Sequence, residues 1–362
     1  MNDSNTLQPA LLGDEAVALG AIHAGISAAY GYPGTPSTEI LEYLIAEYDT
    51  ARTAGRDGPI ARWCTNEKTA LEAGLGASFS GRRAIITMKH VGLNVAADPF
   101  INGALLGIKG GLVIAAADDP GMHSSQNEQD SRFYAAFAMI PCLEPRNQQE
   151  AYDMTREAFE ISERFHVPVL LRLSTRLSHA RAAIVPAPPR AANPLARTED
   201  KTQWMLLPAY ARRNYASLIE KQRVMGEWSA GHRVNRLDMP EGGGTENSGG
   251  NTRHDLVIIT AGLGGNYYEE NRDDFVRDRG GKAPPRLHIG AYPLPVEAIR
   301  KLCEKAERVL VIEEGQPFIE ERLRGILPQA TAVSGKLDGT VNRTGELDPD
   351  NVRKSLGLPP RP

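Results

Sequence analysis

The stretch from Trp63 to Lys89 places one carboxylate, Glu67, at the point where a strand would turn into a helix. Asn66 is a favourable N-cap, small and apolar residues follow at helical spacing, and Gly81 can end the helix. The exposed amides and the positive end of the dipole in a first helical turn favour a carboxylate there. Such a group can perform acid–base chemistry, although most glutamates at this position only start a helix. The residues alone leave both interpretations open.

A second turn that could carry chemistry is G-Y-P-G-T-P-S-T-E-I, residues 31–40, after a predicted strand at 26–30. Its prolines and glycines force a tight turn, and Ser37 or Thr38 can cap the helix that follows. In open α/β sheets ligands bind at the carboxyl ends of the strands, so Thr35 could face a cleft. The alternative, which the residues alone favour, is that Thr35 and Ser37 only satisfy helix amides.

Two further polar turns follow predicted strands. Lys89, His90 and Asn94 come after the strand at 84–88, and a polar segment, 118–132, follows the continuous apolar run 112–117. A loop this polar is usually a solvated connection, but one that follows a buried strand can also line a site. A lone histidine is more often structural than catalytic. The candidates in the longer segment are Asp119, His123, Ser124, Gln126 and Arg132.

The elements that must position these residues alternate between helices and strands. Besides those named, the pattern predicts helices at 15–24, 38–48 and 148–165 and strands at 141–144 and 167–173. Strands that alternate with helices of these lengths indicate an α/β domain with a doubly wound parallel sheet. We assign this domain to residues 1–182.

The remainder is predicted to form a smaller α/β domain behind a linker. Residues 183–253 are expected to be a linker with a bridging helix at 207–228 and a flexible loop at 241–250. Residues 254–335 are expected to form the second domain, followed by an extended tail at 336–362. The predicted elements of that domain are strands at 256–260, 286–289 and 308–313 and a helix at 296–304.

The sequence A-G-L-G-G-N-Y, which follows the strand at 256–260, is expected to be a turn. It could also be a nucleotide fingerprint, but the third glycine is absent at its usual spacing, and no acidic residue follows about 20 positions later at a strand end. A packing turn is the favoured interpretation.

Composition argues against several classes of protein. The 362 residues suggest two domains, and a net charge of -4 gives no reason to expect a nucleic-acid partner. The sequence contains no run of about 18 continuous apolar residues, which argues against a membrane span. No secretory signal is evident either, so we expect a cytoplasmic protein. Cys64, Cys142 and Cys303 are too far apart to suggest a disulfide framework or a cysteine metal site.

Five motifs together resemble the 2-oxoacid:ferredoxin oxidoreductases, and within them the alpha subunits of the indolepyruvate type. The motifs are G-Y-P-G-T-P-S-T-E, N-E-K-T-A-L-E, T-M-K-H-V-G-L-N-V-A-A-D-P, A-D-D-P-G-M-H-S-S-Q-N-E-Q-D-S-R and V-L-L-R-L-S-T-R-L-S-H. They lie between Tyr30 and Arg181, and residues 255–327 are similar more loosely. The resemblance implies a first domain of the thiamine-enzyme pyrimidine-binding type and a second of the transketolase C-terminal type.

The resemblance also implies roles for the candidate residues. Glu67 would hydrogen-bond N1′ of the thiamine diphosphate pyrimidine and so favour the tautomer that deprotonates the thiazolium carbon. Thr35 would lie near the thiazolium and the substrate carboxylate. Gly34 and Asn94 are further cofactor-binding candidates. The candidates for the substrate pocket are Lys89, His90, Asp119, His123 and Arg132, of which His123 or Arg132 could bind the substrate carboxylate.

Two features of this family are not found in the sequence. There is no G-D-G motif for the pyrophosphate and its Mg²⁺, and no C-x-x-C-x-x-C run for an iron–sulfur cluster. The resemblance therefore implies that Mg²⁺ and [4Fe-4S] clusters belong to partner domains or subunits and that this chain holds no metal. It is expected to be a split subunit or a truncated piece, inactive when isolated.

The function implied is oxidative decarboxylation of an aryl-2-oxoacid such as indolepyruvate to acyl-coenzyme A. The expected partners are a subunit that binds the thiamine pyrophosphate and carries the ferredoxin-like domain, a gamma- or beta-type oxidoreductase subunit, and ferredoxin. The assembly would be a dimer of heteromers. The alternatives are a subunit of a non-oxidative 2-oxoacid decarboxylase and a non-catalytic scaffold subunit.

Overall fold

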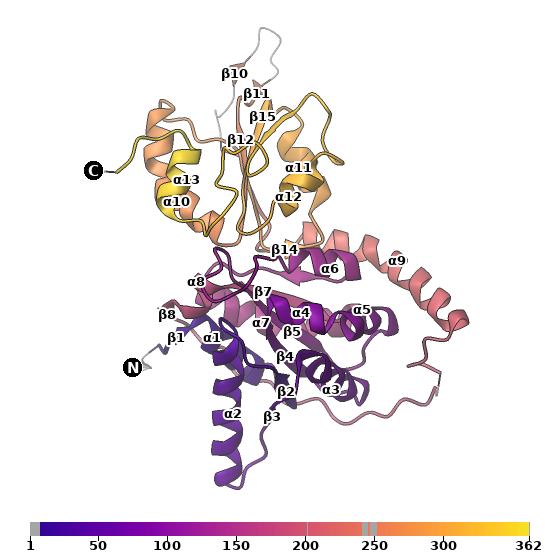
Figure 1. Ribbon diagram of the computed structural model, residues 1–362. Helices are drawn as coiled ribbons and strands as arrows, with labels where there is room; N and C mark the ends of the chain where they lie inside the picture. Colours follow the sequence, from indigo (N-terminus) through magenta and orange to yellow (C-terminus); the bar gives the residue numbers. More distant parts are fainter. Residues whose placement is uncertain (1–7, 201, 241–244, 247–251, 362) are drawn as a thin grey trace, which may run out of the picture. The chain divides into compact units, whose positions relative to one another are not determined.

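A computed structural model describes residues 8–200, 202–240, 245–246 and 252–361, and the chain divides into two compact units (Figure 1). The first unit contains residues 1–119 and 134–221, and the second contains residues 120–133 and 222–362. The chain therefore passes from one unit to the other at three points. Helices α6 (Arg132–Ala138) and α9 (Pro208–Ala230) each contain one of these points.

A parallel sheet with the strand order β6-β7-β5-β4-β2-β3 forms the centre of the first unit. Every residue of β5 is buried, as expected for a strand covered on both faces. A separate antiparallel pair joins β1 and β8. The strands are β1 (Ala10–Leu12), β2 (Ala28–Gly31), β3 (Ile60–Trp63), β4 (Ala84–Lys89), β5 (Leu112–Asp118), β6 (Cys142–Leu143), β7 (Val169–Ser174) and β8 (Arg181–Ala183).

Helices cover both faces of this sheet. Helix α1 packs against α2 and α7, whereas α3 packs against α4 and α5, and Figure 1 shows the two groups on opposite sides of the strands. The prediction of a doubly wound parallel sheet is confirmed. The helices are α1 (Gly13–His23), α2 (Thr38–Thr53), α3 (Glu67–Phe79), α4 (His90–Val95), α5 (Ala97–Leu106), α7 (Gln148–Phe165) and α8 (Thr175–His179).

Side-chain N-caps explain where helices α3 and α7 begin. The Asn66 side chain accepts a 2.9 Å hydrogen bond from the Thr69 amide and caps α3, as predicted. Asn147 caps α7 in the same way through the Glu150 amide. Helix α3 can pack close to the sheet because Gly74 has no side chain. A Cβ at this position would be only 2.3 Å from Cδ1 of Ile86.

The second unit is built on a smaller sheet with the order β16-β15-β12-β13-β9. Strands β12, β13, β15 and β16 are parallel neighbours, and β9 is antiparallel to β13. Figure 1 shows α10 and α13 on one side of this sheet and α11 and α12 on the other. The elements are β9 (Arg236–Asp238), β10 (Thr245–Glu246), β11 (Thr252–Arg253), β12 (Val257–Ala261), α10 (Leu263–Asp278), β13 (Arg286–Ile289), β14 (Ala291–Tyr292), α11 (Val296–Cys303), β15 (Arg308–Ile312), α12 (Phe318–Leu323), β16 (Ala332–Ser334) and α13 (Pro349–Ser355).

The glycine-rich sequence after β12 differs from the predicted turn. Only Gly262, with a φ of 47°, precedes the helix, and α10 already begins at Leu263. A Cβ at Gly264 would lie 2.6 Å from the Ile312 carbonyl oxygen, and one at Gly265 would lie 2.7 Å from the His288 ring. Close packing of α10 on β15 and β13 therefore explains these glycines without a nucleotide.

The C-terminal segment is also not the extended tail that was predicted. Asp348 caps α13 by accepting a 2.7 Å hydrogen bond from the Asn351 amide, and Val352 is fully buried. Arg353 on this helix binds Asp274 of α10 at 2.7 Å. The prediction failed because this short helix is stabilised by contacts with a segment far away in the sequence.

The bridging helix was predicted at 207–228 and is observed as α9. The division between the units falls within this helix, and residues 120–133 belong to the second unit, whereas the sequence suggested a continuous first domain. The loop predicted at 241–250 lies outside the described residues except for β10.

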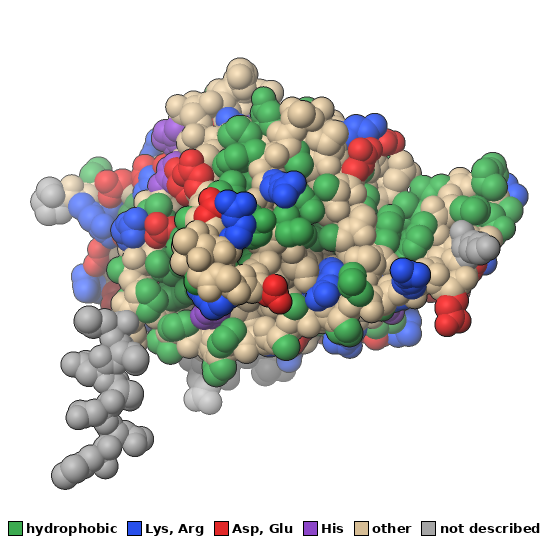
Figure 2. Space-filling model, turned by 90° about the horizontal axis from the view of Figure 1, so that it is seen from below, with side chains coloured by type: hydrophobic (Ala, Val, Ile, Leu, Met, Phe, Trp, Pro, Cys, Tyr) green, Lys and Arg blue, Asp and Glu red, His purple; other side chains and the backbone are tan. Residues whose placement is uncertain are grey.

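The face in Figure 2 carries basic, acidic and hydrophobic side chains interspersed with one another. Among the described residues, no helix is both long and apolar enough to span a membrane.

Candidate functional site

The turns that carry the predicted site residues lie at one edge of the first unit's sheet. Strands β2, β3, β4, β5 and β7 are parallel, so their carboxyl ends share that edge. Gly34 and Thr35 follow β2, Glu67 follows β3, and Lys89 and His90 stand at the junction of β4 and α4. This edge is where open α/β sheets bind ligands.

Glu67 is the first residue of α3, and its side chain is largely buried at 8% exposure. The hydrogen bond that caps the helix joins the Thr69 amide to the Asn66 side chain, so the Glu67 carboxylate takes no part in it. Among the residues that the structure describes, this carboxylate has neither a hydrogen-bond partner nor an ion-pair partner. A buried carboxylate is unfavourable without a partner, so a polar ligand at this position would stabilise it.

Gly92 of α4 provides the space in which the Glu67 carboxylate lies. A Cβ at Gly92 would be 2.7 Å from both Cγ and Oε1 of Glu67, closer than non-bonded atoms approach. Any larger residue would therefore displace the carboxylate. Sequence reasoning did not single out Gly92, because only the tertiary contact between α3 and α4 reveals its role.

Hydrogen bonds within the turn after β2 hold its shape. The Gly34 amide donates to the Thr38 hydroxyl at 2.9 Å, and the Ser37 hydroxyl donates to the Gly34 carbonyl at 2.9 Å. Ser37 is the N-cap of α2 by position, but its side chain forms no cap hydrogen bond, in contrast to the prediction. The Ser37 and Thr38 hydroxyls therefore stabilise the turn itself, and Thr35 in this turn is exposed.

Lys89 and Asn94 lie on the neighbouring β4–α4 segment. The aliphatic stem of Lys89 crosses Gly34, where an added Cβ would be 2.9 Å from its Cδ. Asn94 is exposed, and its Oδ1 accepts a hydrogen bond from the Tyr134 hydroxyl. The structure therefore brings Gly34 and Lys89 together.

The burial of His90 and Asp119 does not fit the predicted contact with substrate. His90 is only 1% exposed, although it follows Lys89 directly. Asp119 is fully buried and accepts a 2.7 Å hydrogen bond from the Thr175 hydroxyl at the start of α8. Asp119 is thus bound to α8, and contact of either side chain with substrate stays a prediction.

Arg132 was predicted as a possible donor to the substrate carboxylate, and the structure contradicts this. Its guanidinium is fully buried and binds Asp130 at 2.5 Å and Glu313 at 2.9 Å, all within the second unit. The correction has a simple cause, because the partner Glu313 is about 180 residues away in the sequence. His123 is half exposed, and its Nε2 is 3.5 Å from Oε2 of Glu346 in the same unit.

Sequence reasoning also missed a buried charge network near this edge of the sheet. Arg172 of β7 binds Asp118 of β5 at 2.6 Å and also binds Glu144, and all three side chains are nearly inaccessible. The available signal was a single arginine within the apolar run V-L-L-R-L-S. The network joins the carboxyl ends of neighbouring strands.

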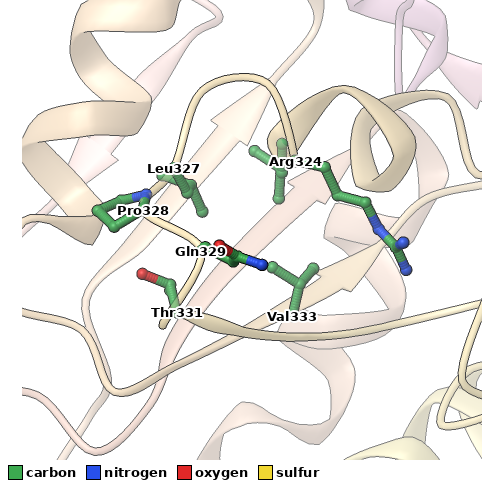
Figure 3. Close-up of a pocket in the computed structure, with 7 residues that line it drawn as sticks. Arg324, Leu327, Pro328, Gln329, Thr331 and Val333 are labelled. Atoms are coloured by element: carbon green, nitrogen blue, oxygen red, sulfur yellow. The ribbon is translucent and has the colours of Figure 1, made fainter.

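A cavity of about 570 Å³ in the second unit contains none of the predicted site residues. Figure 3 shows Val333 of β16 across from Leu327 and Pro328, with the Arg324 side chain extending away from Gln329. Its lining includes no carboxylate, histidine or cysteine. The candidate catalytic groups therefore remain those around Glu67.

Comparison with known proteins assigns the family. The family model described as "Pyruvate flavodoxin/ferredoxin oxidoreductase, thiamine diP-bdg" matches residues 19–234, which is more than half of the chain. The chain therefore belongs to the pyruvate flavodoxin/ferredoxin oxidoreductase family, in which the matched part is the thiamine-diphosphate-binding domain. The resemblance inferred from the five motifs is confirmed.

Individual relatives refine this assignment. The indolepyruvate oxidoreductase subunit IorA of Archaeoglobus fulgidus is 37% identical over 366 residues, covering 97% of this chain and 54% of the relative. IorA of Thermococcus kodakarensis is 38% identical over 321 residues, covering 87% of this chain and 46% of the relative. The chain thus spans about half the length of the curated relatives that it matches.

Solved structures confirm the fold class. A 2-oxoglutarate:ferredoxin oxidoreductase from Magnetococcus marinus matches with a TM-score of 0.70 and 16% identity, covering 91% of this chain and 62% of that one. A split-gene transketolase matches with a TM-score of 0.54 and 14% identity, covering 96% and 94%. These similarities support a pyrimidine-binding-type domain with a second α/β domain of the transketolase C-terminal type.

Proposed function

We propose that this chain is the part of a thiamine-diphosphate-dependent 2-oxoacid:ferredoxin oxidoreductase, of the indolepyruvate type, that supplies the activating carboxylate Glu67. The observation that carries the proposal is the buried Glu67 side chain, which has no polar partner among the described residues and lies against Gly92. A cofactor ring with a polar nitrogen would provide the missing partner.

The residues of this chain fit the pyrimidine end of the cofactor. Thiamine diphosphate, when bound, supplies a nucleophilic carbon and takes up the electrons released as the 2-oxoacid loses CO₂. Glu67 would share a proton with the pyrimidine ring nitrogen and hold the ring in place. Gly34 leaves room for the Lys89 stem and Gly92 for the Glu67 carboxylate, and Thr35 and Asn94 provide polar groups on the same two segments.

We further propose that Lys89 contributes positive charge for the carboxylate of the substrate. Its stem is fixed along Gly34, at the same sheet edge as Glu67. A contact of His123 with the substrate carboxylate stays a prediction from the sequence, and within the second unit its Nε2 lies 3.5 Å from Oε2 of Glu346. Arg132 has no such role, because its guanidinium is bound to Asp130 and Glu313.

The reaction of the assembled complex would convert an aryl-2-oxoacid, coenzyme A and two oxidised ferredoxins to acyl-coenzyme A, CO₂, two reduced ferredoxins and a proton. Two electrons leave the substrate, so each ferredoxin accepts one. Because the sequence has neither G-D-G nor a cysteine cluster motif, Mg²⁺ and the [4Fe-4S] clusters would be held by partner domains or subunits. A dimer of heteromers with a gamma- or beta-type subunit would provide them.

The test is the exchange of Glu67 in the assembled complex. We expect Glu67→Ala and Glu67→Gln to lower turnover by about 10²- to 10⁴-fold, which is typical for the loss of an acid–base group. The matched control is Glu72→Gln, because Glu72 lies on the same helix with its side chain half exposed. Thermal unfolding of each variant checks that the loss does not come from misfolding.

Unchanged turnover in both Glu67 variants would contradict the proposal and support the scaffold alternative. The non-oxidative alternative has a separate test, in which the product is analysed with and without an electron acceptor. The proposal expects acyl-coenzyme A and a strict requirement for the acceptor. Aldehyde formed equally well without an acceptor would instead identify a simple decarboxylase.

A further inference from the structure

A cavity of about 540 Å³ in the second unit is lined by charged side chains that the proposed function does not use. The charged residues of its lining are Arg236, Asp238, Glu269, Arg272 and Arg286. Arg286 is the first residue of β13, so the cavity lies at the amino ends of the parallel strands. Open α/β sheets usually bind their ligands at the opposite edge. This cavity is therefore separate from the usual ligand-binding edge of its sheet.

The guanidinium of Arg286 is the buried centre of this lining. Its side chain is only 6% exposed, and its Nη2 binds Asp238 at 3.0 Å and Glu269 at 2.6 Å. Its Cζ lies 5.0 Å from the centroid of the Tyr268 ring, which helps to fix the guanidinium. Its Nη1 is buried and has no hydrogen-bond partner among the described residues. Because buried donors are rarely left without an acceptor, this nitrogen indicates an acceptor that comes from a ligand.

The two carboxylates of the lining already have cationic partners. Arg286 and Asp238 face each other across the antiparallel pair of β9 and β13. Arg236 adds a second guanidinium, whose Nε is 3.4 Å from Asp238 and whose Nη2 is 4.0 Å from Glu269. Asp238 and Glu269 therefore need no further cation, and the group that would complete the lining is an anion.

Arg272 of α10 is the third cation of the lining. Its side chain is half exposed, and its Nη1 is 3.9 Å from Asp273, which is almost fully exposed and does not line the cavity. An ion pair this long and this exposed contributes little. Three arginines against two carboxylates leave the lining with a net charge of +1. A ligand with one negative charge would balance it.

The rest of the lining is mostly apolar and can accommodate the body of an organic molecule. Cavities of this size bind small molecules through apolar walls and a few polar groups that fix the orientation. A carboxylate brings one negative charge and matches the paired N–H groups of a guanidinium. A phosphate ester would bring more negative charge close to Asp238 and Glu269. The apolar residues are Leu237, Met239, Pro240, Ala283 and Pro284.

We propose that this cavity binds an organic monocarboxylate with an apolar body. Arg286 and Arg272 bind its carboxylate, and the body packs against the apolar part of the lining, which includes Met239 and Pro284. The ligand contacts β9, α10 and the start of β13, so its binding stabilises the second unit. The site does not depend on thiamine diphosphate.

Calorimetric titration of the full chain with phenylacetate, without thiamine diphosphate, tests the chemistry of the ligand. We expect saturable binding that weakens as the NaCl concentration is raised, because part of the site is exposed. Phenylacetamide has the same ring without the charge, and acetate has the charge without the ring. Each should bind at least about tenfold more weakly than phenylacetate. Inorganic phosphate that binds more tightly than phenylacetate would overturn the assignment to a monocarboxylate.

Substitutions test the place of binding. Arg272→Gln should weaken the affinity for phenylacetate by about tenfold, because one charged donor is lost. The matched control is Arg277→Gln, which removes an exposed guanidinium from the same helix outside the cavity and should leave the affinity unchanged. Lys89→Gln alters the proposed contact with the 2-oxoacid substrate and should also leave this affinity unchanged. The two proposals can therefore fail separately.

Arg286→Lys keeps a positive charge beside Asp238 and Glu269 but loses the forked guanidinium, so it should also weaken the binding of phenylacetate. If this variant does not fold, the comparison of Arg272→Gln with Arg277→Gln decides. Equal affinities in those two variants, or no saturable binding to the unmodified chain, would overturn the proposal. A loss of binding in Lys89→Gln alone would overturn it too, because the carboxylate would then bind in the first unit.

Discussion

In the proposed function the chemistry of this chain depends on Glu67, and the structure places a glycine, Gly92, beside its carboxylate. The carboxylate is buried at the first turn of α3, and the nearest part of α4 is Gly92, which has no side chain to occupy the space. A carboxylate in such surroundings is positioned by packing and by the helix start, and it remains able to bind an incoming ring. Small changes in this packing should therefore act on catalysis before they act on stability.

Gly92→Ala tests this packing. The added methyl carbon would lie 2.7 Å from Oε1 of Glu67, so the carboxylate must move, while the helix backbone can accept alanine. We expect turnover of the assembled complex to fall by about 10²-fold, as is typical for a misplacement of roughly 1 Å. The control is Gly76→Ala on α3, where nothing lies within 4 Å of the added carbon. Equal activity of the two variants would argue against the role of Gly92.

The cysteines provide a second prediction at this scale. Burial raises the pKa of the Cys303 thiol to about 12, so at pH 8 only about one molecule in 10⁴ carries the reactive thiolate. Cys142 is buried too, whereas Cys64 is partly exposed. We expect a thiol reagent at pH 8 to modify Cys64 first in the native chain, as measured by mass spectrometry of the peptides. Early modification of Cys303 would show that α11 opens readily.

At the scale of elements, the carboxyl ends of the central strands are held together by buried charges. Arg172 of β7 binds Asp118 of β5 and Glu144, which follows β6. Such a network fixes the relative register of strand ends, and these ends support the turns of the candidate site. It also makes the edge sensitive to the loss of a single charge.

Arg172→Met should destabilise the chain by about 3–5 kcal/mol, because two buried carboxylates would lose their cation. Urea unfolding measures this as a lower midpoint. Arg176→Met on α8 is a suitable control, because Arg176 is exposed and such substitutions usually change stability by less than about 0.5 kcal/mol. A similar small effect at Arg172 would show that water or rearrangement compensates the carboxylates.

Helix α13 offers a smaller test of a single cap. Asp348 accepts the Asn351 amide, so Asp348→Ala should cost about 1 kcal/mol of stability. Asp350→Ala removes a carboxylate from the first turn without removing the cap and should cost less. The difference between their urea midpoints measures the cap itself.

Elements with a complete local pattern were predictable, and those that depend on distant packing were not. The predicted bounds of α7 (Gln148–Phe165) and β13 (Arg286–Ile289) agree with the structure, because their apolar spacing and end signals are unambiguous. The glycines after β12 were misread as a turn, because their role is contact with β13 and β15. The same limit applies to the site, where Glu67 follows from a helix-start pattern but Arg132 was misassigned because Glu313 is distant in sequence.

At the scale of the whole molecule, the proposed function gives this chain a site for the pyrimidine end of the cofactor, whereas the sequence has no G-D-G motif for the pyrophosphate end. The sequence lacks G-D-G, and the chain spans about half the length of the curated relatives that it matches. Most of the binding energy of thiamine diphosphate would come from its pyrophosphate and Mg²⁺. The part described here would then recognise the ring only after a partner has delivered it.

Thiamine diphosphate with Mg²⁺ should therefore not raise the melting temperature of the isolated chain beyond the effect of Mg²⁺ alone. A ligand stabilises a protein only when its concentration exceeds its dissociation constant, and we expect weak binding without the anchor. Thermal unfolding over a range of cofactor concentrations at fixed Mg²⁺ measures this. A large, saturable increase would contradict a site shared between chains or domains.

The three crossings between the units have a practical consequence for anyone who wishes to divide this polypeptide. A shortened chain that stops at residue 182 would keep Asp130 and Arg132 but lose Glu313, leaving a guanidinium without one of its two carboxylates. A single protease cut at one crossing would still leave two covalent connections between the two units. The halves of this molecule should consequently resist separation by simple truncation, and a clean excision would need residues 120–133 to be replaced by a short artificial loop.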